Sequence, residues 1–226
     1  MKTLVVMAHP DWHQSNTQTF LKEAVLNMET VYWYDLQSHM EQLNVPLAQQ
    51  LMKEADRIIF QFPMYWYSAP SSLYSWFEQV LTPGIYNSKL KGKEFGIVVS
   101  TGVSEKQYTA GGGEHFTFSE FLKPFQGIAL KCQMVYLSPF SISLFDYLSD
   151  LEKKQLLINY QQYLTLNRQG SFKAEEQWVI NRLKALSKKD MLKDPDHQLM
   201  GILQILEENR DDIDDLSDTI AQMSEE

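Results

Sequence analysis

The sequence predicts an α/β protein in which helices cover both faces of a parallel β-sheet. Short apolar runs alternate with amphipathic segments of helical period along residues 1–166, and this alternation is typical of parallel strands joined by right-handed helical crossovers. The runs are apolar at consecutive positions, as expected of strands buried on both faces. We therefore expect a doubly wound three-layer sandwich with a five-stranded parallel sheet.

Strands and helices follow one another in regular alternation through this domain. The expected strands are residues 3–8, 31–34, 57–62, 93–100 and 132–137, and the expected helices are residues 17–28, 46–55, 70–80, 116–127 and 150–164. The helices carry apolar side chains at helical spacing. Pro63 ends the third strand, and Pro70 begins the helix after it. The fourth strand ends at Thr101-Gly102, before a long loop that contains three consecutive glycines.

A helical extension, residues 167–226, is expected after the sheet domain. A polar link leads to a helix at residues 174–188, and a second break precedes the final helix. That helix has a heptad seam, in which positions alternate by three and four residues. Its members are Leu199, Ile202, Leu206, Asn209, Ile213, Leu216, Ile220 and Met223. The seam either pairs two subunits as a coiled coil, with Asn209 fixing the register, or packs on the preceding helix as a hairpin.

Composition excludes several classes of protein. Residues 190–226 carry a net charge of −10 and the remainder about +1, so neither part offers the basic stripe that nucleic acid requires. The one cysteine, Cys132, excludes an intramolecular disulfide and indicates a reducing compartment. Since the apolar start of the chain is too short for a signal sequence or a membrane span, we expect a cytoplasmic protein without membrane insertion.

The loops after strands one, three and four should meet at one edge of the sheet, where open α/β sheets bind ligands. The first loop runs into a helix and supplies hydroxyl and amide donors at Ser15, Asn16 and Thr17, which suit an anion or simply cap the helix. The loop lacks a glycine-rich dinucleotide fingerprint. His9, Asp11 and His13 lack a convincing fourth metal ligand, so no metal site is expected.

The loop after the third strand carries three consecutive aromatic residues, Tyr65, Trp66 and Tyr67. They cannot all point inward from one loop, and a flat polar ring system could lie on them. Trp76 and Phe77, in the following helix, are better explained as core.

Motifs around these loops resemble a known family. They are Ala8-His9-Pro10 with Ser15, FQFPMYWYSAP at residues 60–70 followed by Trp76-Phe77-Glu78, Leu90-Lys-Gly-Lys93, and Ser100-Thr-Gly102 with Tyr108 and His115. Together they resemble the flavodoxin-like NAD(P)H:quinone oxidoreductases, a family that includes DT-diaphorase, the modulators of drug activity and the ancillary flavoproteins of bacterial potassium efflux systems. The resemblance covers roughly residues 1–165.

The resemblance implies a flavin site. Residues of the first loop would hold the flavin phosphate: His9, Ser15, Asn16, Thr17 and Gln18. Residues of the second would lie along the isoalloxazine: Pro63, Met64, Tyr65, Trp66 and Tyr67. Ser100, Thr101 and Gly102 would approach the pyrimidine side. Tyr108 and His115 would be the catalytic pair near flavin N1 and the bound acceptor, with Glu114 as the alternative to His115.

The implied activity is ping-pong hydride transfer from NADH or NADPH, through flavin N5, to a quinone-type acceptor. FAD is the expected cofactor and FMN the alternative. The family's usual homodimer, with sites at the interface, is implied as well. The segment LTPGIYNS at residues 81–88 is shorter than its counterpart in DT-diaphorase, which implies a more open cavity. The alternative function is a flavin-binding regulatory subunit of a membrane transporter, whose C-terminal helices dock a protein partner.

Overall fold

The computed structural model describes residues 1–40, 42–167, 172–188, 201–210, 213 and 216. Contacts between Cα atoms divide the chain into two units, Met1–Thr165 and Leu166–Glu226. The first unit is the sheet domain, and the second is helical from Phe172 onward where it is described. In the described parts of the chain, every helix is too short or too polar to cross a lipid bilayer.

The sheet domain is a parallel sheet in which the first strand lies inside rather than at the edge. Its strands are β1 (Thr3–Met7), β2 (Val31–Asp35), β3 (Arg57–Pro63), β4 (Glu94–Thr101), β5 (Val135–Tyr136) and β6 (Phe140–Ser143). They are ordered β2-β1-β3-β4-β5, with β6 also paired to β4, and every pairing is parallel. The reversal of strand order beside β1 places the switch point between β1 and β3. The expected α/β class is confirmed.

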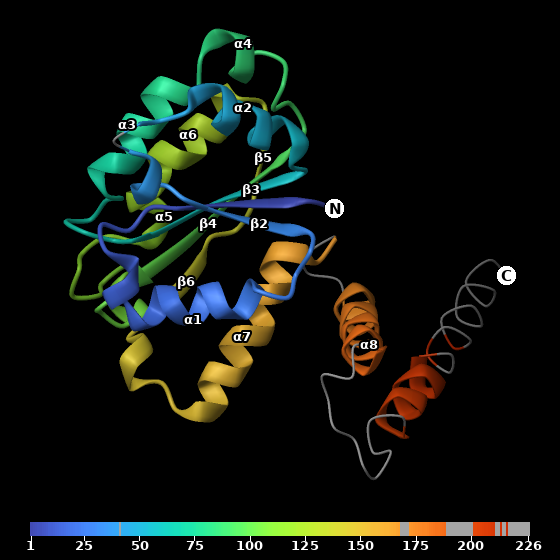
Figure 1. The fold of residues 1–226 in the computed structure, drawn as a ribbon. Coiled ribbons are helices and arrows are strands. Elements are labelled where there is room, and N and C mark those ends of the chain that lie inside the picture. Colours follow the sequence, from blue (N-terminus) through green and yellow to red (C-terminus); the bar gives the residue numbers. More distant parts are fainter. Residues whose placement is uncertain (41, 168–171, 189–200, 211–212, 214–215, 217–226) are drawn as a thin grey trace, which may run out of the picture. The chain divides into compact units, whose positions relative to one another are not determined.

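Helices cover both faces of the sheet (Figure 1). The longer helices are α1 (Asn16–Val25), α2 (Val45–Glu54), α3 (Ser71–Val80), α6 (Lys123–Lys131), α7 (Asp150–Thr165) and α8 (Phe172–Lys188). Short turns of helix are η1 (Trp12–Gln14), η2 (Gln37–His39), α4 (Pro83–Tyr86), η3 (Glu105–Gln107), α5 (Phe118–Phe121) and η4 (Phe145–Tyr147). One core lies between the sheet and α2, α3 and α6, and another between the sheet and α1 and α7. Trp76 and Phe77 are buried in the first, as expected.

Two expected elements have different bounds in the structure. The fifth strand was expected at residues 132–137, but Cys132 caps α6 and Gln133 takes a positive φ of 56°, so pairing begins only at Val135. The strand breaks at Ser138-Pro139 and resumes as β6, because proline has no N–H to donate to a ladder. The helix expected at residues 116–127 is likewise divided into α5 and α6, since Pro124 suits the first turn of a new helix.

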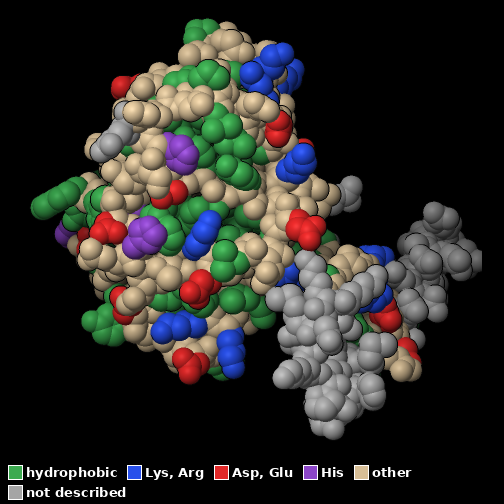
Figure 2. Space-filling view, in the orientation of Figure 1, with side chains coloured by type: hydrophobic (Ala, Val, Ile, Leu, Met, Phe, Trp, Pro, Cys, Tyr) green, Lys and Arg blue, Asp and Glu red, His purple; other side chains and the backbone are tan. Residues whose placement is uncertain are grey.

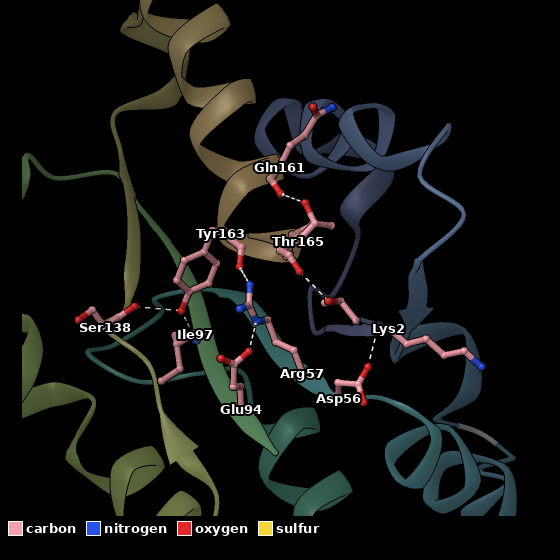
Figure 3. Close-up of polar contacts among 11 residues, drawn as sticks. Lys2, Asp56, Arg57, Glu94, Ile97, Ser138, Gln161, Tyr163 and Thr165 are labelled. Carbon is pink, nitrogen blue, oxygen red and sulfur yellow. Dashed lines mark hydrogen bonds and ion pairs between the residues drawn. The ribbon is translucent and has the colours of Figure 1, made fainter. Parts of the chain in front are cut away.

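The amino edge of the sheet is closed by polar contacts with the end of α7 (Figure 3). The Arg57 side chain is fully buried, pairs with Glu94 at 2.6 Å and donates to the Tyr163 carbonyl. The Tyr163 hydroxyl accepts from Ile97 N–H at 3.1 Å and donates to the Ser138 carbonyl at 3.0 Å. It thereby satisfies the N–H of β4 that faces the break between β5 and β6.

Candidate active site

Four loops meet in an open cleft at the carboxyl edge of the sheet, opposite the Arg57 contacts. The cleft has a volume of about 210 Å³ and is lined by segments that follow β1, β3, β4 and β6. Its lining residues are His9, Ser15, Thr17, Pro63, Met64, Tyr65, Ser100, Thr101, Gly102, Leu144, Phe145, Asp146 and Tyr147. The structure therefore brings together nine of the residues that the sequence indicated, from three separate loops.

The first loop presents the start of α1 to the cleft. Ser15 caps this helix, and its hydroxyl accepts a hydrogen bond from Gln18 N–H at 3.3 Å. The first N–H groups of the helix have no acceptor within the helix. Together with the hydroxyls of Ser15 and Thr17, which line the cleft, they form a donor set suited to a phosphate.

Two other residues of this loop have partners elsewhere. The Asn16 amide donates to the Asp146 carboxylate at 2.8 Å. The Gln18 side chain is buried, and its amide oxygen accepts from the Gln61 amide at 2.6 Å, while the Gln61 oxygen accepts from the Tyr160 hydroxyl at 2.6 Å. The Gln18 side chain thus holds α1 against β3, and only its backbone N–H takes part in the cap at the start of the helix.

His9 is held as a neutral imidazole beside the aromatic loop. Its Nδ1 accepts a hydrogen bond from Asp11 N–H at 3.0 Å, so the proton of the neutral ring lies on Nε2, 3.3 Å from the Tyr65 hydroxyl. Partial burial lowers the pKa of His9, and the Asp11 carboxylate acts in the opposite direction. The ring can therefore donate through Nε2 without carrying a charge.

The aromatic loop is a tight two-residue turn. Tyr65 and Ser68 exchange two backbone hydrogen bonds of 2.9 and 3.0 Å, while Trp66 and Tyr67 both have positive φ, at 49° and 62°. Left-handed φ at both central positions is the pattern of a type I′ turn, which favours Asn-Gly. For bulky residues this left-handed backbone costs about 1–2 kcal/mol of conformational free energy each. The turn holds Trp66 94% exposed, with its ring directed into solvent.

The loops after β3 and β4 are joined to each other and to the loop after β6. Met64 N–H donates to the Ser100 carbonyl at 2.9 Å, and Leu144 N–H donates to the Thr101 carbonyl at 3.0 Å. The Thr101 hydroxyl donates to the Val103 carbonyl at 2.7 Å. A Cβ built on Gly102 meets nothing within 4 Å, so this position is open toward the cleft. These backbone bonds fix the spacing of the loops.

Neither residue of the expected catalytic pair lines the cleft. Tyr108 is buried and stacks on Phe118, with ring centroids 4.3 Å apart. His115 is exposed on a left-handed residue with φ 62°. Glu114 instead faces the tyrosines: its hydrogen bond and its charge raise the pKa of Tyr67, while burial, followed by the Glu114 charge, raises the pKa of Tyr108.

The sequence analysis missed the segment from Leu144 to Tyr147. It follows β6, the strand that was not expected as a separate element, and its Asp146 carboxylate accepts from Asn16. The sequence does carry a strand signal here. Apolar and polar residues alternate in FSIS at residues 140–143, after Pro139, and this alternation is typical of a strand. A strand there brings the following loop to the same edge as the other three.

The cleft combines an anion-binding helix end, hydroxyl groups and aromatic side chains. In the described part of the chain, no three His, Cys, Asp or Glu side chains are grouped so that they could hold a metal ion. On the face of the sheet domain seen in Figure 2, acidic and basic side chains are interspersed rather than gathered in a basic stripe. This chemistry fits a flat ligand that carries a phosphate.

Fold and cleft define a doubly wound α/β domain with its ligand site at the carboxyl ends of the strands. A family model described as flavodoxin-like fold matches residues 1–164, and the chain belongs to that family. A Bacillus subtilis protein named uncharacterized NAD(P)H oxidoreductase YdeQ is 40% identical over 171 residues, which is 73% of this chain and 87% of that protein. A Yersinia enterocolitica glutathione-regulated potassium-efflux system ancillary protein, KefG, is 32% identical over 71% of this chain and 89% of its own length.

Solved structures agree with this assignment. An NADPH-quinone reductase from P. pentosaceus is 41% identical and superposes with a TM-score of 0.70 over 74% of this chain and all of that one. The general stress protein 14 of Treponema denticola, in complex with FMN, is 28% identical with a TM-score of 0.66 over 73% of this chain and 98% of its own. The resemblance drawn from the motifs is confirmed.

Proposed function

We propose that the chain is a flavin-dependent NAD(P)H oxidoreductase that reduces a quinone-type acceptor. The observation that carries the proposal is the cleft itself, in which the capped start of α1 and the aromatic loop after β3 face one space. Relatives named NAD(P)H oxidoreductase and NADPH-quinone reductase, at 40% and 41% identity, support the reaction class.

The first loop would hold the phosphate of the flavin. Ser15 and Thr17 would donate through their hydroxyls and the start of α1 through its N–H groups, while the positive end of the helix dipole favours the anion. His9 would donate from Nε2, as its tautomer allows. The Asn16 and Gln18 side chains would support the loop through Asp146 and Gln61.

The aromatic loop and the loop after β4 would hold the ring system. Pro63, Met64 and Tyr65 line the cleft on one side, and Ser100, Thr101 and Gly102 line it on the other. Trp66 and Tyr67 follow Tyr65, which lines the cleft, and the N–H groups of their turn would serve a ring edge. Because left-handed backbone of this kind is retained where the surroundings require it, we attribute the strained turn to ligand binding.

The chemistry that a bound flavin would supply is ping-pong hydride transfer at N5, from NADH or NADPH to the acceptor. The protein would supply orientation and proton donors. Tyr108, with its raised pKa, stays protonated and can donate a hydrogen bond. His115 is the second proposed catalytic residue, and Glu114, which faces Tyr67 and Tyr108, is the alternative to it.

Phosphate and ring contacts are common to FAD and FMN. We propose FAD as the cofactor, with FMN as the alternative. The T. denticola structure is a complex with FMN. We further propose that the protein is cytoplasmic and a homodimer. Mass analysis of the flavin released from the purified protein distinguishes the two cofactors.

The decisive test of the activity is NAD(P)H consumption with menadione by the flavin-loaded protein, compared with the same concentration of free flavin. We expect turnover far above free flavin, and a Tyr108→Phe variant that retains its flavin but turns over more slowly. Turnover equal to free flavin would exclude the enzyme and leave a binding role.

The alternative is a regulatory subunit of a membrane transporter, supported by the relatives named as ancillary proteins of potassium-efflux systems. Such a subunit would bind flavin in the same cleft without rapid turnover. Co-purification with a membrane transporter from the source cells, together with slow menadione reduction, would favour it over the enzyme.

A further inference from the structure

The second unit presents an apolar helix face that has no partner in the described structure. Residues 201–210 are helical, and so are residues 213 and 216. The seam side chains Ile202, Ile213 and Leu216 are 50%, 46% and 62% exposed, and the adjacent Ile205 is 57% exposed. Seam position Asn209 is exposed as well.

A different face of this helix packs on α8. Glu207 pairs with Lys184 of α8, the Arg210 guanidinium donates to the Gln177 side-chain oxygen, and Leu203 is only 4% exposed. Positions 203, 207 and 210 lie roughly 80–140° around the helix from the middle of the seam. A hairpin was expected from the sequence to pack through the seam itself, whereas the described polar contacts with α8 come from outside the seam. Leu206 is half-buried, and the other described seam residues stay exposed.

The seam has the features of a surface that pairs with itself. Its three-and-four spacing is that of coiled-coil a and d positions, where a single polar residue, most often at an a position, fixes the register between helices. With Leu206 and Ile213 at a positions, Asn209 stands at d, where it would face its own copy in a parallel pair. In the sequence the pattern continues to Ile220 and Met223, which lie outside the described residues.

The charge of this segment disfavours a membrane surface or nucleic acid as its partner. In the sequence, acidic residues stand at positions outside the seam: Glu207, Glu208, Asp211, Asp212, Asp214, Asp215 and Asp218. An anionic lipid surface or nucleic acid would be repelled by them. Two copies would meet through neutral side chains and keep the carboxylates outside, where salt screens their repulsion.

We propose that the C-terminal helix joins two copies of this chain through the seam, with Asn209 opposite Asn209 of the second copy. The family model ends at residue 164, so this surface belongs to the extension rather than to the shared domain. It is independent of the proposed oxidoreductase activity. Pairing should strengthen as salt is raised, because screening reduces the repulsion between the acidic extensions.

Disulfide trapping in the full-length protein tests the proposal. The natural Cys132 is buried, so a cysteine introduced on the helix is the reactive one. We expect mild oxidation to cross-link Asn209→Cys into a covalent dimer, whereas Gln204→Cys, exposed on the opposite side of the same helix, should stay largely monomeric on a non-reducing gel.

Matched second substitutions separate the seam from a general loss of structure. In the Asn209→Cys background, Ile213→Glu should abolish the cross-link, while Phe172→Glu, which places the same charge on an exposed apolar residue of α8, should leave it intact. Equal cross-linking of Asn209→Cys and Gln204→Cys, or a cross-link that survives Ile213→Glu, would overturn the proposal. Retained flavin binding in all variants shows that the sheet domain is unaffected.

Discussion

The two edges of the sheet are built differently. At the amino edge, buried polar groups are paired: Arg57 with Glu94 and the Tyr163 carbonyl, and the Tyr163 hydroxyl with two backbone groups. At the carboxyl edge, the start of α1 opens into a cleft, and a strained turn holds aromatic rings in solvent. The comparison teaches that polar groups at the amino edge are satisfied within the protein, whereas helix donors at the carboxyl edge are left for a ligand.

The largest effect is expected at the amino edge, from Arg57→Met. This change leaves Glu94 without its buried partner and the Tyr163 carbonyl without its donor, and removal of one partner of a buried pair costs about 3–5 kcal/mol. Urea unfolding should show this loss, with flavin affinity of the folded protein unchanged. Lys184→Met, which breaks the exposed pair with Glu207, should cost less than about 1 kcal/mol. Similar costs for the two variants would contradict the special role of this edge.

Gly96→Ala should also destabilise the protein through the amino edge. A Cβ at this position would collide with Ile59 and lie 2.8 Å from the Tyr163 hydroxyl. Overpacking of this kind costs about 1–3 kcal/mol. Gly127→Ala is the matched control: the residue is inside α6 with nothing within 4 Å of the new Cβ, so this change should stabilise by about 0.5–1 kcal/mol. Thermal melts of the two variants should shift in opposite directions.

Substitutions that suit the backbone of the turn at the carboxyl edge should stabilise the protein rather than destabilise it. Replacing Trp66-Tyr67 by Asn-Gly suits a type I′ turn and should stabilise the flavin-free protein by about 1–2 kcal/mol, while flavin affinity falls. Gln133→Gly relieves a positive φ of 56° after α6, so it should stabilise similarly without changing flavin affinity. A turn variant that is less stable than the parent would show that the backbone there is not strained.

The smallest expected effect is a change in pH dependence. Burial lowers the pKa of His9, so the unfolded chain takes up a proton more readily than the folded one, and stability falls as pH drops through about 6.5. His9→Gln should flatten this slope. Hydrogen bonds from Thr117 and Ser149 lower the pKa values of Glu120 and Glu152. The contribution of these two carboxylates to folding stability is therefore lost only at more acidic pH. An unchanged slope near pH 6.5 in His9→Gln would contradict the assignment.

Sequence reasoning succeeded where local pattern decides the structure. Strand β3 and its ending at Pro63 follow from one apolar run and one proline, and the Ser15 cap follows from a hydroxyl before a helix-periodic segment. Local pattern and the switch point also predicted that the loops after β1, β3 and β4 meet. Most of the individual residues expected there came from the family resemblance, and nine of the expected residues line the cleft.

The features that sequence reasoning did not predict depend mostly on contacts between distant parts of the chain. Gln18 was expected in the phosphate loop, but its amide partners the buried Gln61, 43 residues away. The left-handed turn at Trp66-Tyr67 has neither asparagine nor glycine to mark it. The break between β5 and β6 is tolerated because the Tyr163 hydroxyl from α7 satisfies Ile97 N–H, and no local pattern shows that.

The most direct test of the carboxyl-edge site is flavin titration of two helix-cap variants, Ser15→Ala and Asn44→Ala. Each cap accepts a hydrogen bond from the third helical N–H of a ten-residue helix, α1 or α2, so each loss should cost about 0.5–2 kcal/mol of stability. Only Ser15→Ala should also weaken flavin binding, by about tenfold if roughly 1.4 kcal/mol of phosphate contact is lost. Equal flavin affinity in the two variants would contradict the placement of the phosphate at the start of α1.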